Sequence, residues 1–360
     1  MYNIMVINPG STSTKIALYA DQSLLWQENV DHPVEQISAF PTIFDQLDFR
    51  LEMILDMLKA KGVGVEDLSC VMSRGGLLPP LSSGAYEVND QMLDVLQHRP
   101  MNHHASNLGA AIADRIAKAA GIKAYIYDPV TVDEMIDVVR ITGVKKIRRH
   151  GQGHNLNMRA AALKYCADTD VKYTEKNLIV AHLGGGITLS LHSQGRIIDM
   201  ISDDEGPFSP ERAGLIPDYK LAKMIDEENL TYKQVMQKLQ RKSGLMGLLG
   251  QTDSRKVEKM IAEGDEYAKL CYEAMALGVS GSIGRLATVV CGQVDQIILT
   301  GGIANSAMFT KMITDRVQFI APVTVIPGEN EMQALASGAY RILRGEEIAK
   351  QYVEPEGRPY

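Results

Sequence analysis

The feature that most constrains the fold is an order of short segments that occurs twice in the chain. Each copy has an apolar strand, a loop of small residues, a second strand, a turn and a third strand. The first copy occupies residues 3–7, 8–14, 15–19, 21–23 and 24–30. The second occupies residues 177–183, 184–186, 188–192, 193–195 and 196–201, a shift of 177 − 3 = 174 positions. A repeat of this size predicts a duplicated domain that faces its twin across a cleft.

Helical patterns lie between the strand patterns, which is typical of an α/β protein. We expect helices at 49–61, 106–121, 266–291 and 333–343, the last of which returns to the first domain. In the first helix the apolar face consists of Leu51, Ile54, Leu55 and Leu58. The third helix contains Gly278, Gly281 and Gly284, which lower helix propensity, so we expect close backbone packing at these glycines.

Length and composition exclude several classes of protein. The chain has 360 residues, enough for two domains of roughly 150 each. Its 37 basic and 44 acidic residues give a net charge of −7, which argues against nucleic acid as a partner. No apolar run reaches the roughly 18 residues of a membrane span, and the N-terminus lacks the basic region of a signal peptide. The four separated cysteines predict buried, reduced thiols in a cytoplasmic protein.

Three loops have the composition of phosphate-binding turns, although the chain has no Walker A motif and no GxGxxG after a strand. In Asn8–Lys15 a turn at Pro9-Gly10 leads into hydroxyls and backbone N–H groups. Gly184-Gly185-Gly186 lies at the equivalent point of the second repeat. Gly301-Gly302 follows a strand and precedes a helix that we expect Asn305 to open. Ordinary hairpins and βα turns share this composition, but the matching repeat positions favour phosphate binding.

These loops carry a family resemblance. NPGSTSTK, AHLGGGITL and LTGGIANS resemble the superfamily of acetate and sugar kinases, heat-shock chaperones and actin. MSRGG, HHASNLG, YDPVT, RRHGQGH, DEGPFSPERAG, TDSRK and GENEM, in this order, are similar to the acetate kinase family, and the short chain resembles its butyrate kinases. The sequence departs from acetate kinases at Gly75-Gly76 and at Gln152-Gly153.

The resemblance implies an α/β fold of two duplicated ribonuclease H-like domains, of the actin-like ATPase type, facing across a nucleotide cleft. Residues 1–132 with 333–360 would form the N-terminal domain, and 133–332 the C-terminal domain with the adenosine pocket. The implied activity is reversible, ATP-dependent phosphorylation of butyrate, or of a similar short or branched carboxylate, in a homodimer or higher homo-oligomer. An acetate or propionate kinase is one alternative. A chaperone-type or filament-type ATPase is another, but the chain has no room for its extra domains.

The chemistry indicates which residue types are needed. A carboxylate is already ionised, so no general base is required, and direct in-line transfer is the simplest path. Cations, hydrogen-bond donors and Mg²⁺ must instead stabilise the moving phosphoryl group. The resemblance assigns these roles to Arg74, Arg212, His150 and His182.

Each of these residues has a structural alternative. Arg74 could be a surface residue, and Arg212 could pair with Glu211 or Asp204. A metal pair formed by His150 and His154 is discounted, because glycines between them disfavour a helix and no HExxH glutamate is present.

Phosphate and adenosine contacts follow from the same resemblance. The implied phosphate residues are Asn8, Ser11, Ser13, Lys15, Gly184, Gly185 and Gly186, with Ser11 and Ser13 on one side of an extended backbone. The implied adenosine residues are Asp253, Arg255, Gly301, Gly302 and Asn305. Lys15 could instead be a solvent-facing strand residue, and Thr252-Asp253 is also a good helix N-cap.

For the metal, the resemblance implies Glu331 and Asp128, with Mg²⁺ keeping most of its waters; a strand-end cap is the alternative for Asp128. For the acyl group it implies His103, although His103 and His104 also suit a helix-capping role. Gly75 and Gly76 remove side-chain volume beside Arg74, which predicts room for a longer acyl chain. The basic run 145–149 predicts a solvated face with no assigned role.

Overall fold

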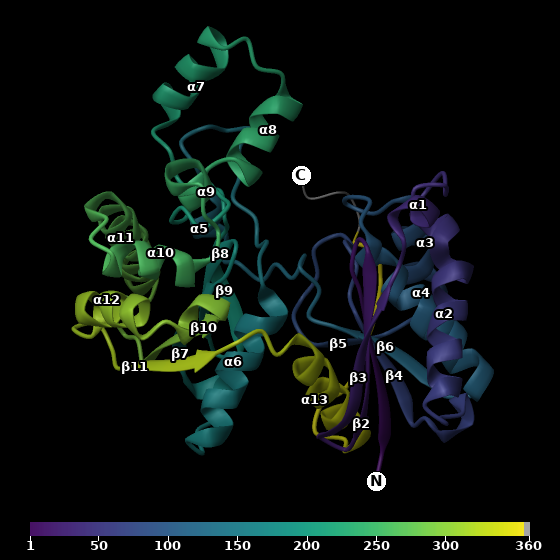
Figure 1. The fold of residues 1–360 in the computed structure, drawn as a ribbon. Coiled ribbons are helices and arrows are strands. Elements are labelled where there is room, and N and C mark those ends of the chain that lie inside the picture. The colour runs from purple at the N-terminus through teal and green to yellow at the C-terminus, as the bar shows by residue number, and fades with distance from the viewer. Residues whose placement is uncertain (356–360) are drawn as a thin grey trace. The chain divides into compact units, whose positions relative to one another are not determined.

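The computed structural model describes residues 1–355 of the chain (Figure 1). The chain divides into two compact units. The first consists of Met1–Asp133 and the chain from Asn330 on, and the second is Glu134–Glu329. No helix within residues 1–355 combines the length and the apolarity that a membrane crossing requires.

The first unit contains a seven-stranded sheet in the order β12-β5-β6-β4-β1-β2-β3. Its strands are β1 Asn3–Pro9, β2 Ser13–Ala20, β3 Ser23–Asp31, β4 Cys70–Arg74, β5 Ala85–Glu87, β6 Lys123–Tyr127 and β12 Lys350–Gln351. β1, β2 and β3 form an antiparallel meander, while β4 and β6 continue the sheet parallel to β1. The three strands predicted for the first repeat are therefore present.

The second unit contains a five-stranded sheet in the order β11-β10-β7-β8-β9. Its strands are β7 Asn177–Leu183, β8 Ile187–Ser193, β9 Arg196–Ile201, β10 Gln296–Gly301 and β11 Val323–Pro327. β7, β8 and β9 again form an antiparallel meander, and β10 and β11 continue parallel to β7.

The two units share one five-stranded plan, which confirms the duplication expected from the repeat. Even a local irregularity is shared. The pairing of the second and third strands shifts register between Leu18 and Tyr19 in one copy and between Leu191 and His192 in the other, 191 − 18 = 173 positions later. β-bulges are specific features of a fold. The duplicated ribonuclease H-like architecture therefore extends to the detail of strand pairing.

Helices cover both faces of each sheet. The first unit has α1 Val34–Ile37, α2 Leu47–Ala60, α3 Asp90–His98, α4 Leu108–Ala120 and α13 Glu331–Leu343. α4 packs on β4 and β6 with α2 beside it, and α13 packs on β1 and β4 from the other side (Figure 1). The C-terminal helix α13 belongs to the first unit.

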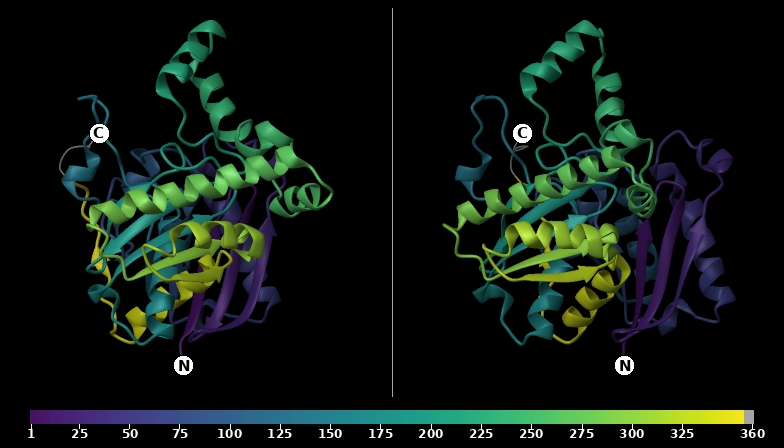
Figure 2. Two further views of the ribbon diagram at one scale, coloured as in Figure 1. Left: turned by 90° about the vertical axis from the view of Figure 1, so that its left-hand side faces the viewer. Right: turned by 60° about the vertical axis from the view of Figure 1, so that its left-hand side comes forward.

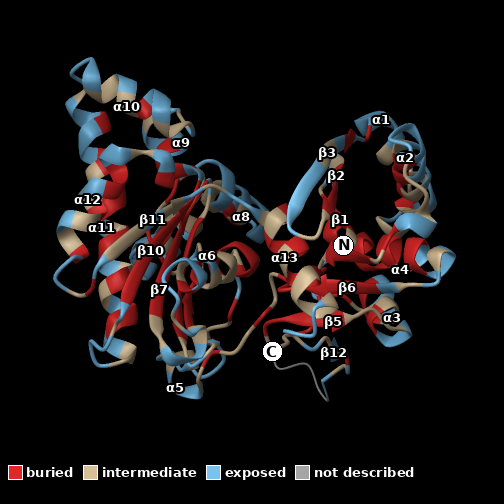
Figure 3. Ribbon diagram, turned by 90° about the horizontal axis from the view of Figure 1, so that it is seen from below, coloured by how far each residue is buried: buried red, intermediate tan, exposed pale blue. Residues whose placement is uncertain are grey.

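The second unit has α5 Asp137–Arg140, α6 Asn155–Asp168, α7 Asp218–Glu227, α8 Tyr232–Arg241, α9 Gly244–Leu249, α10 Ser254–Ala262, α11 Glu266–Val289 and α12 Ala307–Val317. Figure 2 shows the long α11 lying along the second sheet with α12 beside it. α6 packs on β7 and β10. Figure 3 shows that buried residues concentrate in the strands and in the helix faces turned toward them.

Four expectations about packing were wrong. Leu55 is 38% exposed, and Arg50, at 1%, occupies the buried face of α2 instead. A Cβ at Gly278 would meet Pro207, but Gly281 and Gly284 have no neighbour within 4 Å, so close packing does not explain them. Cys291 is exposed, because α11 ends at Val289 and not at residue 291.

Candidate active site

In the first unit, three predicted residues meet at the carboxyl ends of adjacent strands. Asn8 lies near the end of β1, Arg74 ends β4 and Glu331 begins α13. The Oε2 atom of Glu331 accepts a hydrogen bond from Asn8 Nδ2 at 2.7 Å and lies 3.2 Å from Arg74 Nη1. β1 and β4 are parallel neighbours, so their carboxyl ends lie at the same edge of the sheet. The Arg74 side chain is 25% exposed and can still reach an anion.

The loop between β1 and β2 is a tight bend. The Gly10 N–H donates to the carbonyl of Ser13 at 2.7 Å. Ser11 and Lys15 are exposed and Ser13 is half-buried. Because the backbone bends at Ser11 and Thr12, these serines do not lie along one extended strand as expected. Exposure of Lys15 agrees with either of the two roles considered for it.

Sequence reasoning missed the residue beneath this loop. The Arg50 guanidinium donates through Nη1 to the Gly10 carbonyl at 2.8 Å and through Nη2 to the Ser11 carbonyl at 2.9 Å. A signal was available. Arg50, Ile54 and Leu58 are spaced by four residues and form the buried face of α2, where an arginine is unusual.

Gly75 and Gly76 do not open a pocket in the way the sequence suggested. A Cβ at Gly75 would lie 2.5 Å from Pro129 Cβ. A Cβ at Gly76 would lie 2.7 Å from Asn107 Oδ1 and 2.6 Å from Leu96 Cδ2. Neighbouring residues already occupy the volume that side chains would need. The two glycines therefore permit close packing after β4, and the expectation that they leave room for acyl carbons was wrong.

Asp128 and His104 have structural partners in the first unit. Asp128 follows β6, is 2% exposed with φ 36°, and accepts a hydrogen bond from the Gly84 N–H at 2.6 Å. His103 is exposed, whereas His104 caps the 3₁₀ turn Ala105–Asn107 by accepting from the Ser106 N–H. Partial desolvation and the Arg74 charge lower the pKa of His104.

In the second unit, His182 lies near the end of β7 and is 1% exposed. Its ring stacks on that of His154, with centroids 3.9 Å apart and planes 10° from parallel. Asn157 Nδ2 lies 2.9 Å from His182 Nδ1; because an amide nitrogen only donates, the neutral ring carries its proton on Nε2. That Nε2 has no hydrogen-bond acceptor among the residues described, and Glu329 Oε1 is 3.4 Å away. His154 is therefore a stacking partner of His182.

The glycine loop after β7 packs against the loop that carries Arg212. The Gly185 carbonyl accepts hydrogen bonds from Ser209 Oγ at 2.7 Å and from the Glu211 N–H at 3.2 Å. Arg212 Nε donates to Asp203 Oδ2 at 2.9 Å, and Nη1 lies 3.4 Å from Glu211. The guanidinium thus pairs with Glu211, as one alternative held, and with Asp203 instead of Asp204.

His150 and Arg212 line one cavity of about 740 Å³ in the second unit, together with the acidic residues Asp203, Asp204 and Glu205. Arg149 also lines this cavity. We expected residues 145–149 to form a solvated face, but Arg149 is not part of such a face. Its side chain is 11% exposed and pairs with Asp199 at 3.0 Å and Glu205 at 2.5 Å. These ion pairs therefore fix the backbone next to His150 at the edge of the cavity.

The residues implied for adenosine lie around the N-termini of two helices. Asp253 is the N-cap of α10, as one alternative for it held. Its carboxylate accepts hydrogen bonds from the backbone N–H and the guanidinium of Arg255. The Arg255 side chain is 88% exposed. Gly301 has φ 91°, and a Cβ there would lie 2.4 Å from the Leu183 carbonyl, so only glycine fits. Ser306, not Asn305, caps α12.

A side-chain bridge joins these two segments. Glu258 of α10 accepts hydrogen bonds from Ser306 and from the Tyr272 hydroxyl. Gly302 has open space beside it and Asn305 is exposed, so a ligand can approach both. These hydrogen bonds therefore keep the start of α10 and the turn after β10, which carry the implied adenosine residues, close together.

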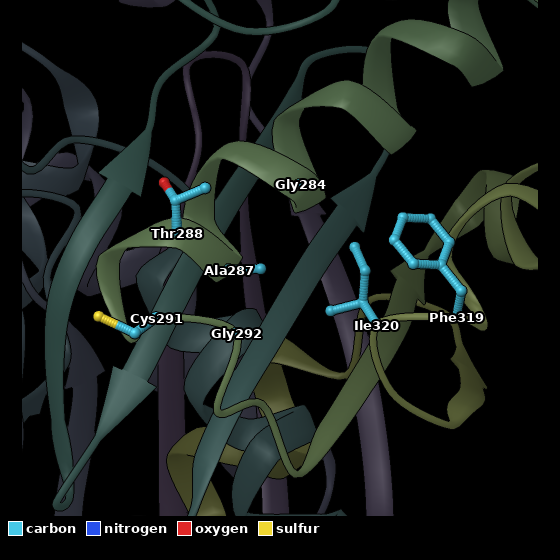
Figure 4. A pocket seen from close by; sticks show the side chains of 7 residues that line it. All are labelled: Gly284, Ala287, Thr288, Cys291, Gly292, Phe319 and Ile320. Atoms are coloured by element: carbon cyan, nitrogen blue, oxygen red, sulfur yellow. The ribbon is translucent and has the colours of Figure 1, made fainter.

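A second concavity in the same unit has a different character. Its volume is about 500 Å³ and its lining comes from the end of α11 and the segment before β11. Figure 4 shows Phe319 and Ile320 on one side and Thr288 and Cys291 on the other. None of the residues assigned from the resemblance lines it.

The carboxylates can be tested against a bound Mg²⁺. Among residues 1–355, no group of three or more His, Cys, Asp or Glu side chains is arranged around a metal position. Mg²⁺ keeps several waters and takes one or two carboxylates when phosphates supply the remaining oxygens. Glu331, which contacts Asn8 and Arg74 at the carboxyl ends of β1 and β4, fits a Mg²⁺ site that has few protein ligands.

The chain resembles known proteins over nearly its whole length. The model of the Acetokinase family matches residues 124–336. Butyrate kinase 1 of Clostridium acetobutylicum is 46% identical over 354 residues, which cover 98% of this chain and 100% of that protein.

Solved structures share the fold at lower identity. Acetate kinase of Porphyromonas gingivalis superposes with a TM-score of 0.77 at 20% identity, covering 95% of this chain and 100% of the other. A propionate kinase of Francisella tularensis gives a TM-score of 0.73 at 19% identity, covering 94% and 99%. The duplicated sheets and their glycine loops define a protein of the actin-like ATPase fold. Within that class, the chain belongs to the acetokinase family.

Proposed function

We propose that this chain transfers the γ-phosphoryl group of ATP to the carboxylate of butyrate, or of a similar short or branched acid, and catalyses the reverse reaction. The chain is a carboxylate kinase, as membership of the acetokinase family indicates. Butyrate is favoured because the relative that is 46% identical over nearly the whole chain is a butyrate kinase. Acetate and propionate, the substrates named for the more distant structures, are the alternative acceptors.

The observation that carries the chemistry is the cluster of Asn8, Arg74 and Glu331 at one edge of the first sheet. The Asn8 amide and the Arg74 guanidinium both contact the same oxygen of Glu331. We propose that a phosphate oxygen lies beside this cluster during the reaction, where the partly exposed Arg74 guanidinium offsets its charge. In the second unit, Arg212, His150 and His182 Nε2 are proposed to donate to phosphate oxygens of the nucleotide.

A carboxylate acceptor sets the remaining requirements. It is ionised at neutral pH, so no side chain has to remove a proton from it. The residues must bring two anions together and exclude water, which would otherwise hydrolyse the acyl phosphate. We propose direct in-line transfer, for which inversion of configuration at a chiral γ-phosphoryl group is the expected result. Net retention would instead require a double displacement.

Three further assignments belong to the proposal. Mg²⁺ would be held by the nucleotide phosphates and, through water, by Glu331 and Asp128, and would neutralise phosphate charge. A cytoplasmic location is proposed from the family resemblance. So is a homodimer, which sedimentation can check. Exposed apolar side chains on the outer face of α11, Tyr267 at 53%, Leu270 at 60% and Leu277 at 59%, support self-association.

Trapping the acyl phosphate as its hydroxamate tests the function directly. The purified protein is incubated with ATP, Mg²⁺ and hydroxylamine, and with straight and branched acids of two to six carbons. Each buried CH₂ contributes roughly 0.8 kcal/mol, so a pocket that buries both extra methylenes favours butyrate over acetate about tenfold in kcat/KM. Absence of hydroxamate from every acid contradicts the kinase assignment, and equal rates with acetate contradict the butyrate assignment alone.

A further inference from the structure

The loop between β1 and β2 packs on a buried arginine side chain, Arg50. Arg50 is 1% exposed, and no acidic side chain of residues 1–355 forms an ion pair with it. Burial lowers the pKa of Arg50 to about 10, so the guanidinium remains charged at neutral pH. Buried charges are costly and are normally paired with an opposite charge. An arginine buried without a carboxylate therefore calls for a functional explanation.

All the hydrogen-bond partners of Arg50 are neutral. Two are the carbonyls of Gly10 and Ser11, at 2.8 and 2.9 Å. Gln46 Oε1 accepts from Nη2 at 2.9 Å and from Nε at 3.1 Å, and Thr14 Oγ1 lies 3.4 Å from Nη1. These contacts satisfy the donors but leave the positive charge uncompensated beneath the loop.

The same contacts fix the direction of two peptide planes. In a trans peptide the C=O of one residue points opposite to the N–H of the next. The carbonyls of Gly10 and Ser11 point at Arg50, so the N–H groups of Ser11 and Thr12 point away from it. Ser11 and Thr12 are exposed, and neither N–H donates a hydrogen bond to any described residue. Two successive N–H groups that point outward can both donate hydrogen bonds to an anion.

We propose that Arg50 is a positioning residue for phosphate recognition. It turns the amides of Ser11 and Thr12 toward the nucleotide phosphates and adds its own buried charge behind them. The inference deepens the proposed function and rests on it, because ATP supplies the anion. Arg50 itself does not touch the ligand, since its guanidinium is covered by the loop it holds.

The test separates phosphate recognition from general structural support. ATP and adenosine are titrated calorimetrically into the wild-type protein and into Arg50→Met and Arg50→Lys. We expect Arg50→Met to bind ATP about 10- to 100-fold more weakly, because the amides lose their orientation and the charge is gone. Adenosine affinity should stay within about twofold. Arg50→Lys keeps a charge but loses the planar fork that holds both carbonyls, so it should lose less ATP affinity than Arg50→Met but should not match the wild type.

Arg341→Met is the matched control. Arg341 is a largely covered arginine of the same unit, but its partners are Glu347 at 3.0 Å and the Tyr127 hydroxyl, neither of which belongs to the loop. The ratio of ATP to adenosine affinity should not change in this variant. Any loss common to both ligands then measures structural damage.

The outcomes distinguish the two levels of the proposal. A wild-type protein that binds no ATP contradicts the proposed function itself. A wild-type protein that binds ATP, together with an Arg50→Met variant that keeps the wild-type ratio of ATP to adenosine affinity, overturns only the role of Arg50. If Arg50→Met does not fold, Arg50→Lys decides: an unchanged ratio overturns the inference, and a ratio lowered about threefold or more supports it.

Discussion

At the scale of single residues, Arg212 links the proposed chemistry to the observed contacts most directly. Its guanidinium is 28% exposed and paired with Asp203, in a cavity that His150 also lines. We predict that Arg212→Ala lowers kcat with butyrate by at least about 10³-fold, because charge spreads over the phosphoryl oxygens in the transition state. ATP affinity, measured by calorimetry, should change little, since the implied adenosine residues near Gly302 are untouched.

Two further variants bracket this prediction. Arg212→Lys keeps the charge but loses the planar fork, so it should recover part of the rate. Arg285→Ala removes another arginine of the same unit, paired with Glu205 at 3.4 Å, and should leave kcat near the wild-type value. If Arg212→Ala retains more than about a tenth of wild-type kcat, the loss is under about 1.4 kcal/mol and Arg212 has only a structural role.

At the scale of elements, sequence and structure agree best where burial is continuous. The predicted strand 177–183 has the bounds of β7, because a strand buried between two neighbours has an apolar run with sharp ends. The predicted strand 196–201 also has the bounds of β9, which is an edge strand. The motifs identified the residues of the site but not their partners. Arg50 lies 40 residues from Gly10, and Pro129 lies 54 residues from Gly75. Such contacts depend on the tertiary fold, which local patterns do not encode.

Glycines in different elements should respond oppositely to alanine. At Gly281 in α11 no atom lies within 4 Å of the added Cβ, so Gly281→Ala should stabilise the protein by about 0.5–1 kcal/mol through lower unfolded-state entropy. At Gly76 the Cβ meets Asn107 and Leu96, so Gly76→Ala should destabilise by about 1–3 kcal/mol. Thermal unfolding of both variants measures the two shifts. Stabilisation by Gly76→Ala would show that space exists beside it after all.

At the scale of the whole molecule, each unit contains a buried histidine that resists protonation. His32 is 2% exposed and contacts Thr14 Oγ1 at 2.8 Å; burial, with help from Arg50, lowers its pKa to about 4. His192 is fully buried between Ser190 and Tyr173; burial, with help from Arg159, lowers its pKa to about 3. The unfolded chain binds these protons near pH 6.5 and the folded chain does not. Stability is therefore lost as pH falls below 6.5, until the folded-state pKa values are reached.

Between pH 6.5 and 5 we predict a loss on the order of 1–2 kcal/mol for each histidine. Denaturant titrations across this range should show the slope, and His32→Gln and His192→Gln should each remove their own share of it. His98→Gln, at an exposed position, should leave the slope unchanged. Identical slopes in all four proteins would mean that other groups control acid stability.

The division of the first unit into two stretches of sequence has a consequence for the chain as it leaves the ribosome. Helix α13 covers β1 and β4, and the Tyr352 carbonyl accepts a hydrogen bond from Asn89 at 2.9 Å. Every strand and helix of the second unit is synthesised before these residues exist. At about 5–20 residues per second, the first 133 residues wait roughly 10–45 s for their last partners. During that interval the sheet face that α13 will cover is bare, so we expect the nascent first unit to be prone to aggregation until α13 is made.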